Sequence, residues 1–565
     1  MPFRRLAVYA VSVLLFAVAP ATAETVAKKH IIAAANPYAT DAGRQMMRAG
    51  GSAVDAAIAA QLVLTLVEPE SSGIGGGAFM MVYDPTTKAV TSFDGRETAP
   101  ASATPTMFLD ANGKARPHAE AIPGGLSTGV PGDIAMLEMA HAKYGKLAWS
   151  KLFDPAIRLA ETGFPIGPKL AGTIASHAAM AAKMPDFKRY FFHPDGTPMA
   201  RGEILKNPQY ARTLRTLAKD GAKAFYSGPL AQAIVDAVNN APVNKTTMTL
   251  ADLSAYHAVE RPAVCGAYRG RRICSMGPPS SGGVAIVQIL GMLERFDKNA
   301  LMPTSLSGVH LFTQASRLAF ADRALYLADP DAVNVPLEGL IDRGYLAERS
   351  KLIDPAKDMG MAQAGTPPQK HADYAPQRSP QLPGTSHLSV VDDSGQVVSM
   401  TMTIESSFGD YLMANGFFLN NELTDFSFDP VLNGKPVANA PAPGKRPLSA
   451  MAPTIVFGRD GKFWIATGSP GGPLIIDFVA QSLIAMIDTQ LKPQATAALP
   501  RVVNLNSPTI LEKGTSVEAL IPQLKAMGHN VVTFEIESGL HIVQRVKGGY
   551  IGGADPRRDG NVAGD

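Results

Sequence analysis

The fold is decided at residues 384–392, which read Gly384-Thr385-Ser386-His387-Leu388-Ser389-Val390-Val391-Asp392. This stretch predicts a short strand, and a second strand is predicted over 396–403. The three residues between them, 393–395, form a hairpin loop that ends in glycine, the residue that best tolerates a left-handed conformation. Counting outward from the loop sets Thr385 opposite Thr403. Taken alone, such a pair is more often a sheet-stabilising contact than an activated nucleophile.

Five further segments change that balance. They are Phe-Asp-Gly-Arg-Glu-Thr-Ala-Pro at 93–100, Pro-Pro-Ser-Ser-Gly-Gly at 278–283, Asn-Asn-Glu-Leu-Thr-Asp-Phe at 420–426, Arg-Pro-Leu-Ser at 446–449 and Gly-Ser-Pro-Gly-Gly at 468–472. Residues 384–392 resemble the processing site of the γ-glutamyltransferase family, a branch of the N-terminal-nucleophile hydrolases. The other five segments are similar to further motifs of that family, in the family's order. The resemblance spans nearly the whole chain and favours Thr385 as a nucleophile.

The resemblance implies an α+β fold, a four-layer α/β/β/α sandwich of the N-terminal-nucleophile hydrolase type. It also implies self-cleavage before Thr385. The products would be a large subunit of residues 24–384 and a small catalytic subunit of residues 385–565, paired as a heterodimer in one interlocked domain. The order of predicted elements agrees with such a sandwich, because helices dominate 130–330 and strands dominate 387–468.

Hydrophobic periodicity predicts the individual elements. Helices are expected over 39–49, 53–67, 132–144, 149–161, 207–218, 229–240, 281–295, 306–328, 474–489 and 516–527. Ser52 is the predicted N-cap of the second helix, with Asp55 completing a capping box. The glycines at 73–77 follow a helix and precede a strand, the reverse of a dinucleotide-binding loop, so we interpret them as a close backbone crossing.

The chemistry expected at the processing site has two stages. In the uncut chain the Thr385 hydroxyl attacks the carbonyl of Gly384, where no side chain obstructs the approach. Cleavage frees the Thr385 amine, which acts as a base toward its own hydroxyl, and an α-amino pKa of about 7.7–8.0 suits that duty. By resemblance, Thr403 orients the nucleophile. Gly471 and Gly472 match the family's oxyanion hole, in which amides stabilise the developing negative charge.

Recognition of a γ-glutamyl head requires a cation and acids. By resemblance, Arg96 binds the α-carboxylate, which a guanidinium can hold with two parallel hydrogen bonds. Ser449 adds a hydroxyl donor, and Glu422 and Asp425 bind the α-ammonium group. Glu405 stands where the family often has asparagine. We expect this third carboxylate to favour an ammonium-bearing head, unless burial keeps it protonated.

Two other departures from the family pattern bear on the reaction. Ala450 replaces a serine that commonly follows Ser449, which removes a hydrogen-bond donor worth roughly 1 kcal/mol. No aromatic residue lies between Pro430 and Arg446, where many members of the family carry an aromatic lid. The pocket is therefore expected to be more open to water, with hydrolysis dominant over transfer to another amine.

These features predict an enzyme that cleaves γ-glutamyl amides such as glutathione through a γ-glutamyl ester on Thr385. Water, an amino acid or a peptide accepts the acyl group, and no cofactor or metal is expected. One alternative is an acylase of the same superfamily that removes glutaryl side chains, including those of β-lactams such as cephalosporins. A second is a non-catalytic periplasmic binding protein that keeps the fold but never matures.

The first 23 residues read as a secretory signal. Arg4 and Arg5 precede an apolar run from Leu6 to Ala19, and residues 21–23 are a small-residue cleavage site. The run is too short to span a bilayer, so we expect a periplasmic or secreted protein without a membrane anchor. Removing both arginines lowers the formal charge from +3 to +1. That balance argues against nucleic acid as a partner.

The two cysteines have a local interpretation. Arg269-Gly270 suits a two-residue turn, and counting outward from it sets Cys265 opposite Cys274. An exported compartment permits a disulfide, and two free buried thiols fit the same pattern.

Overall fold

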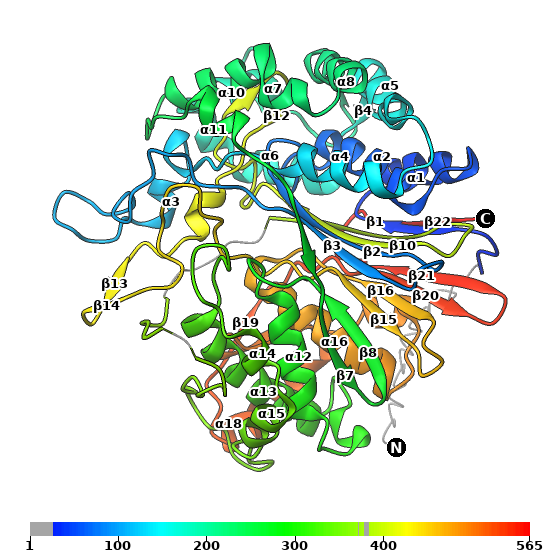
Figure 1. The fold of residues 1–565 in the computed structure, drawn as a ribbon, viewed down its shortest axis with the longest axis vertical. Coiled ribbons are helices and arrows are strands. Elements are labelled where there is room, and N and C mark those ends of the chain that lie inside the picture. Colours follow the sequence, from blue (N-terminus) through cyan, green and yellow to red (C-terminus); the bar gives the residue numbers. More distant parts are fainter. Residues whose placement is uncertain (1–25, 371, 378–383) are drawn as a thin grey trace, which may run out of the picture.

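The computed structural model describes residues 26–370, 372–377 and 384–565. The predicted signal peptide, residues 1–23, lies outside them. Two β-sheets pack face to face at the centre, and helices cover the outer side of each sheet (Figure 1). The expected four-layer α/β/β/α sandwich is confirmed.

The first sheet has seven strands. Their order is β22 (Asn561–Gly564), β1 (Ile31–Ala34), β9 (Ser386–Val391), β10 (Val397–Thr403), β2 (Gly77–Tyr83), β3 (Val90–Gly95) and β6 (Val259–Pro262). The second sheet has six strands. Their order is β21 (Gly549–Ala554), β20 (His541–Val546), β16 (Phe463–Thr467), β15 (Thr454–Phe457), β8 (Arg271–Ser275) and β7 (Val264–Tyr268). Each sheet contains strands from both predicted subunits, and in the first sheet β9 and β10 lie between β1 and β2, so the two halves of the chain interlock.

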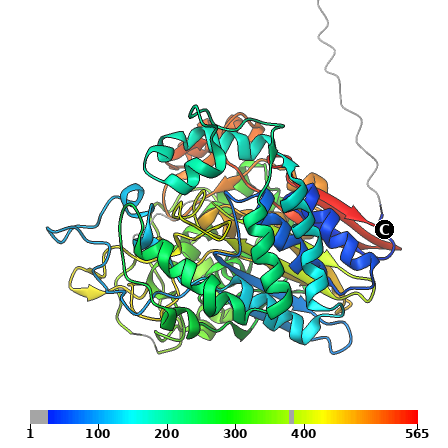
Figure 2. The ribbon, with the colours of Figure 1, turned by 90° about the horizontal axis from the view of Figure 1, so that it is seen from above.

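Two helical layers enclose the sheets, and Figure 2 shows the upper one from above. The upper layer contains α1 (Pro37–Arg48), α2 (Ala53–Val67), α4 (Asp133–Tyr144), α5 (Asp154–Thr162), α6 (Pro168–Ser176), α7 (Pro185–Phe191), α8 (Pro208–Asp220), α9 (Lys223–Tyr226), α10 (Gly228–Asn239) and α11 (Leu250–Ser254). The lower layer contains α12 (Gly282–Leu293), α13 (Leu306–Tyr326), α14 (Leu337–Leu340), α15 (Arg343–Ser350), α16 (Ile475–Asp488) and α18 (Ile521–Ala526).

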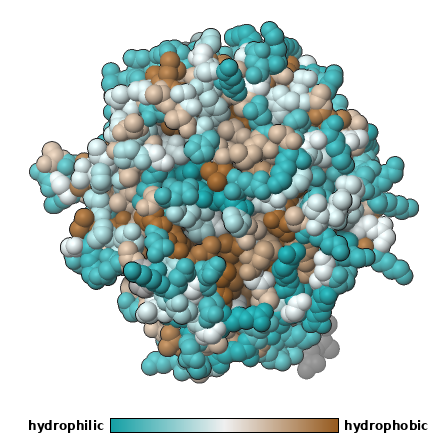
Figure 3. Space-filling view, in the orientation of Figure 1, coloured by the Kyte–Doolittle hydropathy of each residue, from teal (hydrophilic) through white to brown (hydrophobic). Residues whose placement is uncertain are grey.

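Shorter elements complete the chain. They are α3 (His118–Ala121), α17 (Pro493–Ala497), β4 (Phe164–Pro165), β5 (Ile204–Leu205), β11 (Met413–Ala414), β12 (Phe417–Phe418), β13 (Val431–Leu432), β14 (Lys435–Pro436), β17 (Val502–Val503), β18 (Thr509–Glu512) and β19 (Val531–Phe534). On the face in Figure 3, hydrophilic residues cover most of the rim, and hydrophobic residues gather below the middle. No helix of the described residues is long and apolar enough to cross a membrane.

Strand alternation separates two hydrophobic cores. Val398, Met400 and Met402 on β10 point toward the upper helices and belong to a core that includes α1 and α2. The alternate residues of β10 point toward the second sheet, where the Ser399 hydroxyl donates to the Thr467 carbonyl at 3.0 Å. The polar residues of β10 therefore line the space between the two sheets, and Thr403 lies at the end of this row.

The predicted helices are found, two of them in a modified form. Residues 149–161 and 516–527 each divide into a 3₁₀ turn followed by an α-helix. A proline in the first turn starts the new helix in both places, because it lacks the N–H that a continuing helix requires. The predicted capping box of Ser52 and Asp55 is present.

The structure decides between the alternatives for the glycines at 73–77 and for the two cysteines. A Cβ atom on Gly75 would lie 2.0 Å from the Phe418 carbonyl oxygen, so the run is a close backbone crossing. Cys265 and Cys274 form a disulfide across β7 and β8, with an S–S distance of 2.06 Å.

Candidate functional site

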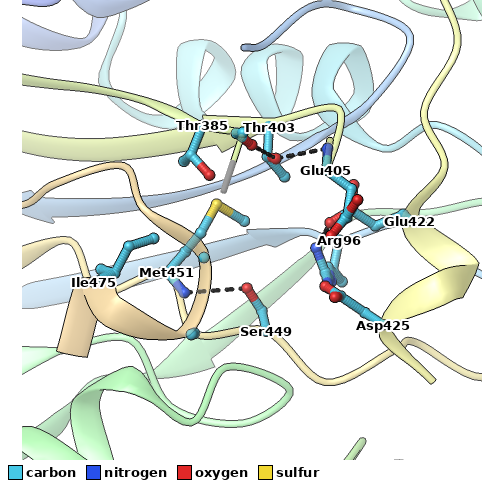
Figure 4. Close-up of a pocket in the computed structure, with 12 residues that line it drawn as sticks. Arg96, Thr385, Thr403, Glu405, Glu422, Asp425, Ser449, Met451 and Ile475 are labelled. Atoms are coloured by element: carbon cyan, nitrogen blue, oxygen red, sulfur yellow. Dashed lines mark hydrogen bonds and ion pairs between the residues drawn. The ribbon is translucent and has the colours of Figure 1, made fainter. Parts of the chain in front are cut away.

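Strand pairing places the two threonines as the sequence predicts. Ser386 on β9 pairs with Met402 on β10, so the next residues outward, Thr385 and Thr403, lie opposite each other. The chain is uncut here, and the Thr403 hydroxyl donates to the Gly384 carbonyl oxygen at 2.5 Å (Figure 4). This hydrogen bond polarises the carbonyl that the Thr385 hydroxyl is expected to attack.

Gly384 is fixed by packing. A Cβ atom at this position would lie 2.1 Å from the Glu405 carbonyl oxygen, well inside van der Waals contact. Glu405 has a positive φ of 78°, and its amide donates to the Thr403 hydroxyl at 2.8 Å. The turn after β10 therefore folds over the predicted cleavage site and leaves room only for glycine.

Arg96 lies directly after β3, with its side chain 1% exposed. Its Nη1 donates to Glu422, and its Nη2 donates to Asp425 at 2.5 Å. The same guanidinium donates to the carbonyl oxygens of Pro447 and Leu448 at 3.0 and 3.1 Å. The predicted cation and acids are thus brought together from two segments far apart in the sequence, and Arg96 contacts both acids (Figure 4).

Burial changes the ionisation of these acids. It raises the pKa of Glu422 to about 7, against the opposing effect of Arg96. Burial, and then the charge of Glu422, raises the pKa of the neighbouring Glu97 carboxyl well above its usual range. The sequence interpretation missed Glu97, although it lies inside the segment 93–100.

Glu405 is held by an amide that the sequence interpretation also missed. Asn421 Nδ2 donates to Glu405 Oε2 at 2.6 Å, and Asn421 Oδ1 accepts from the Ser406 amide at 3.0 Å. The signal was available, because Asn421 immediately precedes Glu422 in the segment 420–426. The third carboxylate is therefore positioned beside the other two.

The opposite wall is formed around Ser449. Its hydroxyl accepts from the Met451 amide at 3.2 Å, which leaves the hydroxyl hydrogen available to a ligand. Its carbonyl accepts from the Ser281 amide at 2.8 Å, so the segment 278–283 supports this wall. The Met451 side chain extends toward the threonines (Figure 4).

Gly471 and Gly472 precede α16 with positive φ values of 134° and 56°. Within the described part of the chain, neither amide donates a hydrogen bond, so both remain available. Gly472 lines the pocket, and Gly471 does not. Gly472 is therefore the member of the predicted pair that lies at the pocket in the uncut chain.

One small pocket unites most of the predicted site. It is lined by Arg96, Gly384, Thr385, Thr403, Glu405, Glu422, Asp425, Ser449, Ala450, Met451, Gly472 and Ile475. Its free volume is about 20 Å³, room for roughly a single water molecule. The uncut chain thus leaves no space for a γ-glutamyl head, and an open pocket stays a prediction for the cleaved form.

A group of charges lies behind the nucleophile. The Ser386 hydroxyl donates to Glu68 Oε2 at 2.6 Å, and Arg558 Nη1 donates to the Thr385 carbonyl oxygen at 2.9 Å. Glu70 is buried with neither carboxyl oxygen hydrogen-bonded, and burial together with Glu68 raises its pKa to about 8. The sequence interpretation missed these residues, although two acids directly after an apolar helix are an unusual pattern.

The described residues contain no group of three or more His, Cys, Asp or Glu side chains arranged to hold a metal ion.

Comparisons with known proteins agree with this geometry. Residues 39–565 match the family model described as gamma-glutamyltranspeptidase. The glutathione hydrolase proenzyme of Bacillus subtilis is 38% identical over 95% of this chain and 92% of its own length, and that of Escherichia coli is 36% identical over 94% and 91%. The crystal structure of a cephalosporin acylase from Bacillus halodurans superimposes with a TM-score of 0.85, at 27% identity and 99% coverage of both chains.

Proposed function

The chain belongs to the γ-glutamyltranspeptidase family, and we propose that it matures by self-cleavage and then hydrolyses γ-glutamyl amides such as glutathione. The observation that carries the proposal is the pocket itself. It places Thr385 and Thr403 against Arg96 and the acids Glu422 and Asp425. A nucleophile thus faces groups that complement both charges of a γ-glutamyl head.

Maturation divides the chain into residues 24–384 and 385–565. The Thr385 Oγ attacks the Gly384 carbonyl carbon, the C–N bond breaks, and the hydroxyl proton passes to the Thr385 nitrogen, which leaves an ester and a free amine. Water then hydrolyses the ester, giving a Gly384 carboxylate and restoring the Thr385 hydroxyl. Support comes from the Thr403 hydroxyl on the Gly384 carbonyl oxygen and from packing that admits only glycine there. The two fragments remain together as a heterodimer, because each sheet contains strands from both.

In the mature enzyme the Thr385 amine takes the proton from its own hydroxyl, and Oγ attacks the γ-carbonyl carbon of the substrate. The amides of Gly471 and Gly472 stabilise the oxyanion. The protonated leaving amine departs, which leaves a γ-glutamyl ester on Thr385. Water attacks this ester and releases glutamate, and an amino acid or peptide amine in place of water completes a transfer.

Head recognition uses the buried charges in two roles. The substrate α-carboxylate binds Arg96 and the Ser449 hydroxyl. The α-ammonium group binds Glu422 and Asp425, with Glu405 completing the set. Both acids already contact the Arg96 guanidinium. A ligand that carries an α-carboxylate and an α-ammonium group can therefore enter without leaving any of these charges unpaired. No aromatic residue lies between Pro430 and Arg446, which favours water over a bulkier acceptor.

The proposal is tested by comparing the mature enzyme on γ-glutamyl-anilide and on glutaryl-anilide. These substrates differ only in the α-amino group. We expect kcat/KM to favour γ-glutamyl by at least roughly tenfold, about 1.4 kcal/mol. Equal rates would mean that the acids do not contact the substrate.

The similarity to a cephalosporin acylase favours a second candidate, an acylase that removes glutaryl side chains. It predicts the opposite preference in the same experiment. The three acids near the head make this candidate weaker, because a glutaryl group offers them no ammonium. Export to the periplasm or the medium, with cleavage after residue 23, completes the proposal and is checked by N-terminal sequencing of the secreted protein.

A further inference from the structure

Arg558 approaches the nucleophile from behind, at a peptide group that self-cleavage leaves intact. Its Nη1 donates to the Thr385 carbonyl oxygen at 2.9 Å, across 173 residues of sequence. That carbonyl belongs to the peptide bond between Thr385 and Ser386, on the opposite side of Thr385 from the predicted cut. The contact is therefore compatible with the mature enzyme, in which the Thr385 amine is free.

The loop that carries Arg558 is anchored independently of the pocket. It joins β21 to β22, and the Arg558 amide donates to the Asp555 carbonyl oxygen at 3.3 Å. The Asp555 carboxylate accepts from Arg501 Nη2 at 2.9 Å and from the Ser538 hydroxyl at 2.5 Å. The Arg558 side chain is itself 3% exposed. The guanidinium thus reaches Thr385 from a buried and well-connected loop.

The next residue along β9 is held as well. The Ser386 hydroxyl donates at 2.6 Å to Oε2 of Glu68, which is buried at the C-cap of α2. Two side chains from opposite ends of the chain therefore fix the start of β9, one at the Thr385 carbonyl and one at the Ser386 hydroxyl. Fixing this peptide group restricts how Thr385 can turn within the pocket.

Acids outnumber cations on the pocket side of the free amine. The pocket that contains Thr385 includes Glu405, Glu422 and Asp425, and Arg96 is already paired with the last two. Negative charge near an amine favours the ammonium form and raises the pKa of the amine. An ammonium group cannot accept the hydroxyl proton, so these acids oppose the role of the amine as a base.

The groups behind β9 are also mostly acidic. They are Glu68, Glu70, Glu537, Asp559 and Lys169. Burial lowers the pKa of the two nearby imidazoles, His387 and His541, so neither adds a positive charge near neutral pH. The cation that touches Thr385 itself is Arg558.

Arg558 supplies the opposing charge at short range. A guanidinium stays charged throughout the pH range of proteins. Three bonds with a total length of about 4.2 Å join a carbonyl oxygen to the amine nitrogen of its own residue, so Arg558 Nη1 lies within about 7 Å of the Thr385 amine. Among the described residues, Glu537 is the carboxylate within ion-pairing distance of Arg558, at 3.7 Å, and it is 52% exposed and shared with Lys169. Solvent screens Glu537 more than it screens the buried guanidinium.

We propose that Arg558 positions the nucleophile and, through its charge, keeps the freed Thr385 amine in the neutral form that acts as a base. This inference rests on the proposed function, because it assigns the role within the mature site. A cation disfavours a second positive charge beside it, so the amine loses its proton more easily. The Thr385 hydroxyl proton then moves to this amine as Oγ attacks, and Arg558 gives up no proton of its own.

The first experiment titrates the amine directly in the mature enzyme, without substrate. Trace acetic anhydride acetylates neutral amines, and mass spectrometry of the N-terminal peptide of the small subunit follows N-acetylation of Thr385 against pH. We expect a wild-type pKa below the ordinary value of about 7.7–8.0. Arg558→Gln, which keeps a donor without the charge, should raise this pKa by about one unit. Arg558→Lys keeps the charge and should leave the pKa lowered.

Steady-state kinetics with γ-glutamyl-anilide give the second readout. The acidic limb of kcat/KM against pH reports the essential base of the free enzyme. In Arg558→Gln this limb should move up by about one unit, so that kcat/KM falls roughly tenfold near pH 7 and recovers at high pH. A merely structural role would lower kcat/KM equally at every pH. Arg545→Gln is the matched control, because this arginine of β20 pairs with Asp460, and it should keep the wild-type limb.

Three results would overturn the inference. They are a wild-type Thr385 amine with a pKa of about 8 or higher, an Arg558→Gln amine that titrates like the wild type, and an Arg558→Gln kcat/KM that is reduced equally at every pH. A lowered wild-type pKa without hydrolysis of γ-glutamyl-anilide would support the inference and refute the proposed function. A wild-type chain that stays uncut would refute both. The wild-type titration needs no variant, so it decides the matter even if Arg558→Gln fails to fold.

Discussion

The two sides of the pocket around Thr385 are built in different ways. On the nucleophile side, Thr385 and Thr403 are positioned by backbone pairing within one hairpin. On the side that receives the head group, Arg96 meets acids that lie 326 and 329 residues away, and buried charge holds them together. Local register fixes the first side and long-range ion pairing fixes the second. They should therefore respond differently to substitution.

The largest effect is expected on the nucleophile side. Thr385→Ala removes the attacking oxygen, so the chain should remain full length and show no γ-glutamyl hydrolysis. Intact mass and gel analysis of the purified variant measure this. Thr385→Ser, which keeps a hydroxyl, is the matched control and should still cleave. Two fragments separated between residues 384 and 385 in the alanine variant would refute autocatalysis.

Gly384→Ala tests whether packing on this side limits cleavage. Its methyl group would meet the Glu405 carbonyl oxygen at 2.1 Å. The strand start must then shift away from the Thr403 hydroxyl. Self-cleavage should slow at least about tenfold, about 1.4 kcal/mol in the barrier, as followed by the rate of fragment appearance. Gly172→Ala, which meets nothing within 4 Å, is the control. Equal cleavage rates would show that the site relaxes freely.

The same contrast explains what the sequence could predict. A hairpin with a three-residue loop fixes which residues face each other, so Thr385 opposite Thr403 followed from counting. The sharing of Arg96 by Glu422 and Asp425 could not be obtained by counting, because it depends on how two segments far apart in the sequence pack against each other. The family resemblance supplied these residues, but not their mutual ion pairs.

Residues outside the quoted segments were missed for a related reason. Glu68, Glu70 and Arg558 gain their importance only when α2 and the C-terminal strands pack behind β9. Periodicity predicts that α2 is buried, yet it does not say what the residues after the helix will contact. Residues 149–161 and 516–527 were each predicted as a single helix, and a proline divides each of them. The prediction followed the apolar pattern and gave too little weight to the proline.

Asp425→Asn tests the charge-held side, with a smaller expected effect. The amide keeps the shape but loses the charge offered to the substrate ammonium. We expect kcat/KM on γ-glutamyl amides to fall about 10- to 100-fold, from the roughly 1.5–3 kcal/mol of a charged hydrogen bond. Maturation should proceed normally, since the hairpin is untouched. Asp429→Asn, four residues along, is the control. An unchanged kcat/KM in a matured Asp425→Asn enzyme would remove Asp425 from the head site.

Glu70→Gln extends the comparison to the acids behind the nucleophile. Burial and Glu68 raise the pKa of Glu70 to about 8 in the folded protein, while an unfolded chain has a value near 4.3. The folded state binds this proton more tightly than the unfolded chain does. The stability that the protonated Glu70 contributes is therefore fully present below about pH 4.3 and is lost as pH rises toward 8. Each pH unit in that window costs up to about 1.4 kcal/mol.

Glutamine cannot ionise, so the variant should escape this loss. Its melting temperature should match that of the wild type near pH 4.5 and exceed it increasingly toward pH 8. Thermal unfolding of both mature proteins across this range measures the difference. Glu535→Gln, at a carboxylate that is 89% exposed, should give a nearly constant offset. If the melting temperatures of Glu70→Gln and the wild type differ by the same amount at every pH, the Glu70 carboxylate is solvated in the mature enzyme. Burial of charge is then confined to the head-binding side of the pocket.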